Sequence, residues 1–326
     1  MGIETDFKFA HKHAEEGLAV AAKAPVDLLG PLRALVGAKG KKRWKGTGFN
    51  MIWRPNHGGQ SGPQDFFLEL NETSETLEFT DISGTGVGNR GFNQNDIFLG
   101  AVAYLQQISD PVAGPQHFEP GVWANAPATT DPTEPTTVVR MGSIPHGTSI
   151  NLQGIGFQAP TPIIAATTIT PFTAGSKDDG ATALVHFPEE KNVQTLMPSR
   201  TPPANVPGLD DAHLANPNLF LTDVLAKQTV LSTTVLVVTS EVKSTLAPSG
   251  ATPPAPDGGG GTDSIAFLVS GSQGPNAGPA RVTATFWIER IRDHSGHEFE
   301  QLQYTQRVLL NFHGLSWPHV SVATLR

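Results

Sequence analysis

The sequence predicts an all-β protein built from antiparallel strands, with a short N-terminal helix and a long irregular insertion. The composition points this way, because 34 glycines and 27 prolines in 326 residues, with only 16% charged residues, exclude a long-helix or coiled-coil protein. Apolar residues late in the chain also recur with a period of two. That pattern gives each strand one buried side and one wetter side, as antiparallel sheets have.

The overall charge and the residue types exclude several function classes. A formal net charge of −8 argues against a nucleic-acid-binding protein, which needs a basic surface. Cysteine is absent, which excludes disulfides, thiolate metal sites and a cysteine nucleophile. The first residues lack the basic and apolar stretches of a secretory signal, and no run of about 18 apolar residues predicts a membrane span. We therefore expect a soluble, cytoplasmic protein; a homodimer remains open.

The chain is expected to form one elaborated domain after a helical extension. Residues 10–24 are rich in Ala, Glu and Lys and end at a proline, so residues 1–27 are predicted as a helical extension. Residues 27–37 form a short apolar turn or helix that could close one end of a sheet structure. Residues 28–326 then form a single domain, interrupted by an insertion at about 160–279.

Strand and turn signals begin near Trp44. A first hairpin is expected from strands at 66–70 and 76–80 around the polar stretch 71–75, and a second from 138–141 and 149–152 around 145–147. Further strands are expected at 97–108, 233–239, 265–269, 281–291, 299–312 and 320–325. The best helix candidate inside the insertion is 214–229.

Two histidines stand out among the eleven. If residues 114–123 are extended, His117 and Glu119 project to the same face, so the carboxylate can hold the imidazole in one tautomer for proton transfer. A purely structural His–Glu pair fits that spacing too. His319 shares a strand face with the small residues Ser321 and Ala323, which leaves space for a bulky ligand. A core histidine is the other interpretation.

The order of several short motifs resembles that of the nitrobindins, which are heme-binding β-barrels of fatty-acid-binding-protein-like shape. The segments that carry the resemblance fall in two blocks, at about 28–155 and 281–326. They are Leu-Arg-Ala-Leu-Val-Gly at 32–37, Trp-Lys-Gly-Thr-Gly at 44–48, Tyr104 followed by Gln-His-Phe-Glu-Pro-Gly-Val-Trp at 116–123, and the closing Trp-Pro-His-Val-Ser-Val-Ala-Thr-Leu at 317–325. The middle insertion has no counterpart in that family.

The resemblance implies an antiparallel up-and-down, calycin-like β-barrel that binds heme b. It implies His319 as the proximal iron ligand and His117, with Glu119, on the distal side as candidate catalytic residues. The apolar wall around the cofactor is expected to include Phe286, Tyr304 and Leu310. Arg140 and Met141 are further candidate cofactor-binding residues; because they are adjacent in one strand, only one of them should face the ligand.

Three functions remain to be distinguished. The resemblance implies an open iron position for a small diatomic or peroxide, with nitric oxide binding, peroxidase activity or peroxynitrite isomerisation as its chemistry. The alternative is a metal-free carrier of an apolar small molecule or fatty acid. A hydrolase or glycan-binding β-sandwich is the third option; it requires converging carboxylates, for which Glu69, Glu78 and Glu119 are available.

Overall fold

The structure is a computed structural model that describes residues 27–57, 66–89, 91–131, 133–144, 147–176, 208–241, 261–272 and 274–326. The helix predicted at 10–24 lies outside these residues, and so does most of the turn of the second predicted hairpin. Within the described ranges, no helix is long and apolar enough to cross a membrane.

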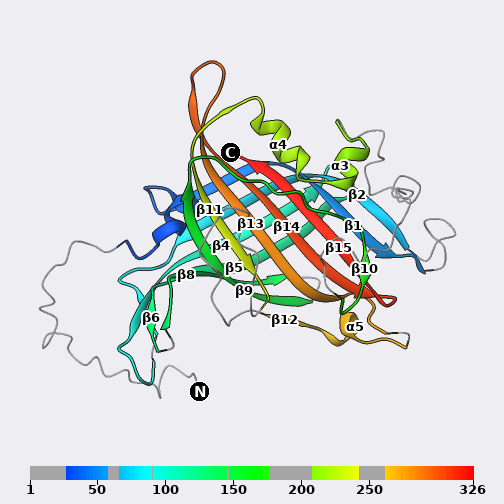
Figure 1. Ribbon diagram of the computed structural model, residues 1–326, viewed down its shortest axis with the longest axis horizontal. Coiled ribbons are helices and arrows are strands. Elements are labelled where there is room, and N and C mark those ends of the chain that lie inside the picture. Colours follow the sequence, from blue (N-terminus) through cyan, green and yellow to red (C-terminus); the bar gives the residue numbers. More distant parts are fainter. Residues whose placement is uncertain are drawn as a thin grey trace, which may run out of the picture.

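Antiparallel strands dominate the described chain and form a large ring-like sheet (Figure 1). In ring order the strands are β1 (Lys41–Pro55), β2 (Phe66–Asp81), β4 (Ile97–Asp110), β5 (Gly114–Ala126), β8 (Thr137–Ile144), β9 (Thr148–Ala159), β11 (Thr229–Thr239), β13 (Gly278–Arg292), β14 (Glu298–Phe312) and β15 (Leu315–Leu325). The shorter elements are β3 (Val87–Asn89), β6 (Thr129–Thr130), β7 (Thr133–Glu134), β10 (Phe172–Thr173), β12 (Gly261–Ser264), the 3-10 turn η2 (Gly30–Leu32), and the helices α1 (Arg33–Val36), α3 (Asp211–Ala215), α4 (Leu219–Leu225) and α5 (Ala266–Val269).

The first and last ring strands pair with each other and so close the sheet. β1 pairs with β15 in antiparallel register, from Gly46 opposite Leu325 to Ile52 opposite His319. Closure removes the free sheet edges that would otherwise leave backbone N–H and C=O groups unpaired. The all-β, antiparallel prediction is thus confirmed as a barrel-like sheet.

The first predicted hairpin is wrong, because residues 66–80 belong to the single strand β2. The polar stretch that suggested a turn keeps the period of two. Asn71, Thr73 and Glu75 are buried and lie on the same face of the strand as Leu77 and Phe79. Polar side chains on an inward face therefore produced the turn-like composition. The second hairpin is confirmed, since β8 and β9 pair antiparallel.

The sheet carries an apolar cluster on each face, one inside the ring and one on part of its outer surface. The inner cluster includes Trp44, Phe79, Trp123, Phe286 and Leu302. At one end of the ring, Leu29, Leu32, Leu35 and Val36 from η2 and α1 join this cluster, and the Trp44 indole donates to the Leu35 carbonyl at 3.1 Å. The short apolar segment at 27–37 therefore closes one end, as the sequence suggested (blue in Figure 1, at the opposite end from α5).

The middle of the chain contributes one strand to the ring and an apolar cover to its outer face. β11 takes a place in the ring between β9 and β13, so the middle supplies a ring strand. The preceding part packs on the outside: Ile169, Leu214 and Leu221 form the outer cluster with apolar residues of β1, β2, β13 and β15. Figure 1 shows α3 and α4 over this outer face. The outer face of these strands is consequently buried as well.

Two local predictions in this region need correction. The helix expected at 214–229 is two short helices, α3 and α4, because Pro217 lies between them and cannot continue an α-helix. The strand expected at 265–269 is instead the short helix α5, whose apolar side chains Phe267 and Val269 are exposed. That apolar run resembled a strand, but no partner strand pairs with these residues in the described chain.

Candidate functional site

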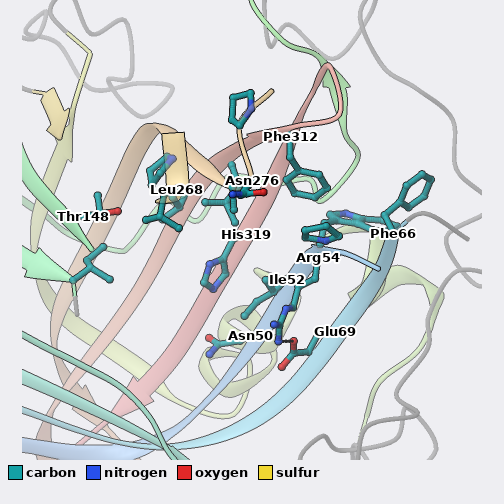
Figure 2. A pocket seen from close by; sticks show the side chains of 18 of the residues that line it. Asn50, Ile52, Arg54, Phe66, Glu69, Thr148, Leu268, Asn276, Phe312 and His319 are labelled. Atoms are coloured by element: carbon teal, nitrogen blue, oxygen red, sulfur yellow. Dashed lines mark hydrogen bonds and ion pairs between the residues drawn. The ribbon is translucent and has the colours of Figure 1, made fainter. Parts of the chain in front are cut away.

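A cavity of about 1060 Å³ occupies the interior of the ring at the end opposite η2 and α1. This lies at the upper end of the usual range for ligand pockets. Its apolar lining includes Ile52, Ile108, Ile144, Val308 and Leu310. Phe267 and Leu268 of α5, with Pro275, Asn276 and Ala277 after it, add a further part of the wall, and Figure 2 shows Leu268 and Asn276 above His319.

His319 lines the cavity from β15. It lies between Ile52 of β1 and Val308 of β14 in register, and its ring projects from the strand into the cavity (Figure 2). The Ser321 hydroxyl, two residues along the same face, is 3.4 Å from Nε2. The strand alternation that the sequence predicted thus holds for His319 and Ser321.

His117 lines the same cavity from a distant strand, β5. Around the ring, β1, β2 and β4 separate β15 from β5 in one direction, and β8, β9, β11, β13 and β14 separate them in the other. The two strands are therefore close to opposite each other. Since both imidazoles line one cavity, a ligand inside it is enclosed between walls that each carry a histidine.

A fully buried ion pair lies next to His117. The Arg140 guanidinium donates from Nη2 to Glu119 Oε1 at 2.6 Å, and the Tyr104 hydroxyl donates to the same oxygen. The other carboxylate oxygen, Oε2, is 3.6 Å from His117 Nε2. Arg140 also donates from Nη1 to Gln306 Oε1 at 2.7 Å, and Gln306 lines the cavity.

The electrostatics keep this pair charged. Burial opposes ionisation of Glu119, but the Arg140 charge, with help from His117 and Tyr104, lowers the pKa of the carboxyl to about 2. Burial raises the pKa of Tyr104, so its hydroxyl keeps its proton and donates. A permanent carboxylate therefore lies beside His117.

Two glycines create the space for this group. A Cβ on Gly142 would be 2.4 Å from the Tyr104 hydroxyl oxygen and 2.8 Å from Glu119 Oε1. A Cβ on Gly121 would be 2.5 Å from the Tyr104 ring. Both glycines are paired with each other in the β5–β8 register. Any other residue at these positions would push the buried side chains apart.

A second buried polar group lies close by. The Tyr304 hydroxyl donates to Glu75 Oε2 and accepts from Gln106 Nε2 at 2.9 Å, while Thr73 donates to Glu75 Oε1 at 2.8 Å. Burial raises the pKa of Glu75 above its ordinary value, against the effect of these hydrogen bonds. Tyr304 and Gln106 line the cavity, whereas Glu75 does not. The Glu75 carboxyl therefore lies behind these side chains, in contact with Tyr304.

The cavity also contains amide side chains that sequence reasoning did not single out. Asn50 and Asn71 are directly opposite each other on β1 and β2, and both line the cavity. Glu69, two residues before Asn71, accepts from Arg54 Nη1 at 3.0 Å (dashed in Figure 2). The signal that could have revealed Asn71 is the period-two pattern running unbroken through 69–79.

The other predicted site residues divide between the cavity and its surroundings. Tyr304 and Leu310 line the cavity. Phe286 lies in the inner core, where its ring stacks on Tyr304 with centroids 5.3 Å apart. Of the adjacent pair, Arg140 faces inward but is held in the buried network, and Met141 is 41% exposed on the outer face. Met141 is thus not placed to contact a ligand in the cavity.

The carboxylates named for a hydrolase do not converge. Glu78 is on the outer face of β2, where it pairs with Arg43 at 3.2 Å. Glu69 lines the cavity, whereas Glu119 is fully buried with Arg140. Alternation along β2 sends Glu69 and Glu78 to opposite faces, since they differ by an odd number of residues. The β-sandwich interpretation therefore has no catalytic pair among these residues.

In the part of the chain that the structure describes, no group of three or more His, Asp or Glu residues is arranged to hold a bare metal ion. A metal that arrives inside a macrocycle needs fewer protein ligands, because the macrocycle supplies the others.

Comparisons with known proteins add little to this geometry. No protein-family model matches the chain, and no curated protein matches it. Among solved structures the chain is similar to the crystal structure of Rv2717c from M. tuberculosis, with a TM-score of 0.36 and 11% sequence identity over 92% of this chain and 98% of that one. A TM-score this low supports no inference about function.

Proposed function

We propose that the protein binds heme b in its cavity, as a barrel of the nitrobindin type, with His319 as the protein ligand to iron. The observation that carries the proposal is the inward position of His319 on the wall of a cavity of about 1060 Å³. A neutral imidazole is a good ligand for heme iron. When bound, the heme would offer an open iron position to nitric oxide, a peroxide or another small molecule.

The residues present fit such a group. The apolar side chains of Ile52, Val308 and Leu310 surround His319 and would exclude water from a flat, largely apolar macrocycle. The Ser321 hydroxyl is close enough to the imidazole to influence its orientation. Cationic and imidazole groups among the lining residues, Arg54, His57 and His313, are available for carboxylate substituents.

In this proposal His117 acts on a small molecule from the other wall. The carboxylate of Glu119, held ionised by Arg140, lies 3.6 Å from His117 Nε2 and can orient the ring. As a base, His117 would accept a proton from a peroxide in the cavity and return it to the departing oxygen. Glu119 is a positioning residue here, because it is buried behind His117. Peroxide reduction and peroxynitrite isomerisation are the reactions that the resemblance suggests.

The test is a titration of the purified protein with hemin, followed by its absorption spectrum. We expect wild-type protein to give a Soret band with saturable, one-to-one binding, and His319→Ala to lose most of the affinity. His297→Gln, a change of an exposed histidine outside the cavity, is the matched control and should retain it. The proposal would be rejected if the wild-type protein caused no saturable change in the Soret band of added hemin. A His319→Ala variant that binds hemin as tightly as wild type would also reject it. Colourless protein carrying an apolar ligand would favour the carrier function.

A further inference from the structure

The short helix α5 exposes apolar side chains at the mouth of the cavity. Ile265 is 54% exposed, Phe267 71% and Val269 48%. Phe267 and Leu268 also line the cavity, so this single helical turn borders both the cavity and the solvent. In Figure 1, α5 lies at the edge of the molecule, at the end of the ring opposite η2 and α1. Large apolar side chains gathered on one exposed segment are typical of a contact surface.

The chain around α5 carries no charge. No Asp, Glu, Lys, Arg or His occurs between Asp263 and Arg281, in a protein whose formal net charge is −8. Charged side chains are costly to remove from water, so a segment without them can leave water at little cost. The absence of basic residues also means that α5 has no electrostatic attraction to an anionic surface. The partner that fits this segment is therefore apolar and without net charge.

The backbone of this segment is satisfied internally, although it lies at the surface. The Asn276 side chain donates from Nδ2 to the Phe267 carbonyl at 2.7 Å and to the Ser270 carbonyl at 3.2 Å. The Leu268 carbonyl accepts from the backbone N–H of Ala277 at 3.1 Å. In water such carbonyls can bond to solvent, whereas in lipid an unpaired carbonyl is strongly unfavourable. The internal pairing therefore suits a segment that leaves water.

We propose that α5 is a membrane-contact element, whose side chains Ile265, Phe267 and Val269 enter the interfacial layer of a lipid bilayer without net charge. A fluid bilayer suits one protruding helical turn, because it needs none of the matched surface that a protein partner requires. The mouth of the cavity then faces the bilayer, and an apolar ligand passes between the two without crossing water. This contact goes beyond ligand binding and does not require iron.

The first test is flotation of the full-length protein with phosphatidylcholine vesicles, without added hemin. We expect wild type to float with the vesicles at low and high salt alike, because the contact is apolar. Vesicles that include anionic phosphatidylglycerol should bind less protein, since the net charge of −8 is repelled. The double variant Phe267→Ser/Val269→Ser should lower the partition coefficient roughly tenfold or more, as the loss of two buried apolar side chains predicts.

The second test asks whether the side chain itself enters the lipid. All five native tryptophans are buried, so a change of emission in the Phe267→Trp variant reports the introduced indole. We expect its emission to move to shorter wavelength with phosphatidylcholine vesicles and to be quenched by brominated acyl chains. An emission that neither shifts nor is quenched would overturn the proposal.

The controls separate α5 from other apolar positions and from His319. Phe98→Ser removes a phenylalanine that is 52% exposed on β4, at the end that η2 and α1 close, and should leave flotation unchanged. His319→Ala should leave it unchanged as well, so failure of heme binding does not affect this test. Thermal unfolding checks that each variant is folded.

Three further outcomes would overturn the proposal. One is a wild-type protein that does not float, or that floats only with anionic vesicles at low salt. Another is an equal loss of flotation in Phe98→Ser and in the α5 variant. The third is a dimer in sedimentation velocity without lipid that the α5 variant dissociates, because a second copy of the chain would then cover the helix.

Discussion

Arg140 and Glu119 form an ion pair with both side chains fully buried and a distance of 2.6 Å between Nη2 and Oε1. The pair connects β8 to β5 and lies beside a histidine of the cavity wall. Two charges can be kept away from water only if each has several polar partners, and Tyr104 and Gln306 provide them here. This arrangement keeps an ionised carboxylate behind His117.

Removing one charge of this pair should destabilise the fold strongly. We expect Arg140→Met to lower the free energy of unfolding by about 3–5 kcal/mol, because Glu119 is then buried without its partner. Chemical denaturation measures the effect. The double variant Arg140→Met/Glu119→Leu should recover most of the loss, since it leaves no unpaired charge. Arg290→Gln, in an exposed pair with Glu298, should change stability by less than about 1 kcal/mol. A single variant as mild as this surface control would contradict the interpretation.

Buried Glu289 should make stability depend on pH. Burial raises its pKa to about 7, although Gln301 donates to the carboxyl at 2.9 Å and opposes the shift. The unfolded chain titrates near about 4.3, so folding favours the protonated form. The stabilisation is complete below the unfolded pKa and is lost as the pH rises through 7.

Glu289→Gln should therefore be about 3–4 kcal/mol more stable than wild type above pH 8, and nearly equal to it at pH 4. Denaturation at several pH values measures the difference between the two curves. Glu300→Gln, on the exposed side of β14, is the matched control and should show no such crossover. Parallel curves for Glu289→Gln and wild type would show that the carboxyl titrates normally in the folded protein.

The space left by Gly142 can be tested directly. Gly142→Ala places a methyl group against Tyr104 and Glu119, and we expect it to lower the free energy of unfolding by about 1–3 kcal/mol. Gly88→Ala is the matched control, because the nearest atom to its added Cβ is 3.7 Å away. Differential scanning calorimetry of the two variants compares a tight position with an open one. Equal melting temperatures would show that the buried network adjusts freely.

His117 and His319 should differ in their effects if heme binds as proposed. We expect His117→Ala to keep most of the heme but to lower the rate of reaction with hydrogen peroxide about 10²- to 10⁴-fold, the usual contribution of a general acid–base group. Stopped-flow spectroscopy of the hemin-loaded protein measures the rate. His297→Ala, in an exposed turn, controls for the loss of a histidine as such. Equal loss of heme from the two cavity variants would indicate two axial ligands instead.

Parts of the site could be predicted from sequence because a strand imposes a simple rule. Alternation placed His319 with Ser321, and His117 with Glu119, on common faces, and both pairs do share a face in the structure. Alternation also required that only one of Arg140 and Met141 face inward. Alternation could not determine which of the two faces inward. That depends on the neighbouring strand β5, whose buried Glu119 pairs with Arg140.

The polar residues of β2 follow the same alternation, although their composition predicted a turn. Asn71, Thr73 and Glu75 looked like a turn because polar residues are rare inside a barrel-like sheet. They are inside because Glu69, Gln106 and Tyr304, from the same and other strands, supply hydrogen-bond partners. Gln106 and Tyr304 are distant from β2 in sequence, so local composition could not reveal them.

The sequence by itself determined the strand-rich architecture, the helical turn that closes one end, and the two inward histidines, because period and turn chemistry act over a few residues. Only the tertiary structure decided that β11 completes the ring between β9 and β13 and that Arg140 neutralises Glu119. Each of these depends on strand order and register. They are fixed by how distant segments bury their faces against one another, and no local pattern encodes that choice.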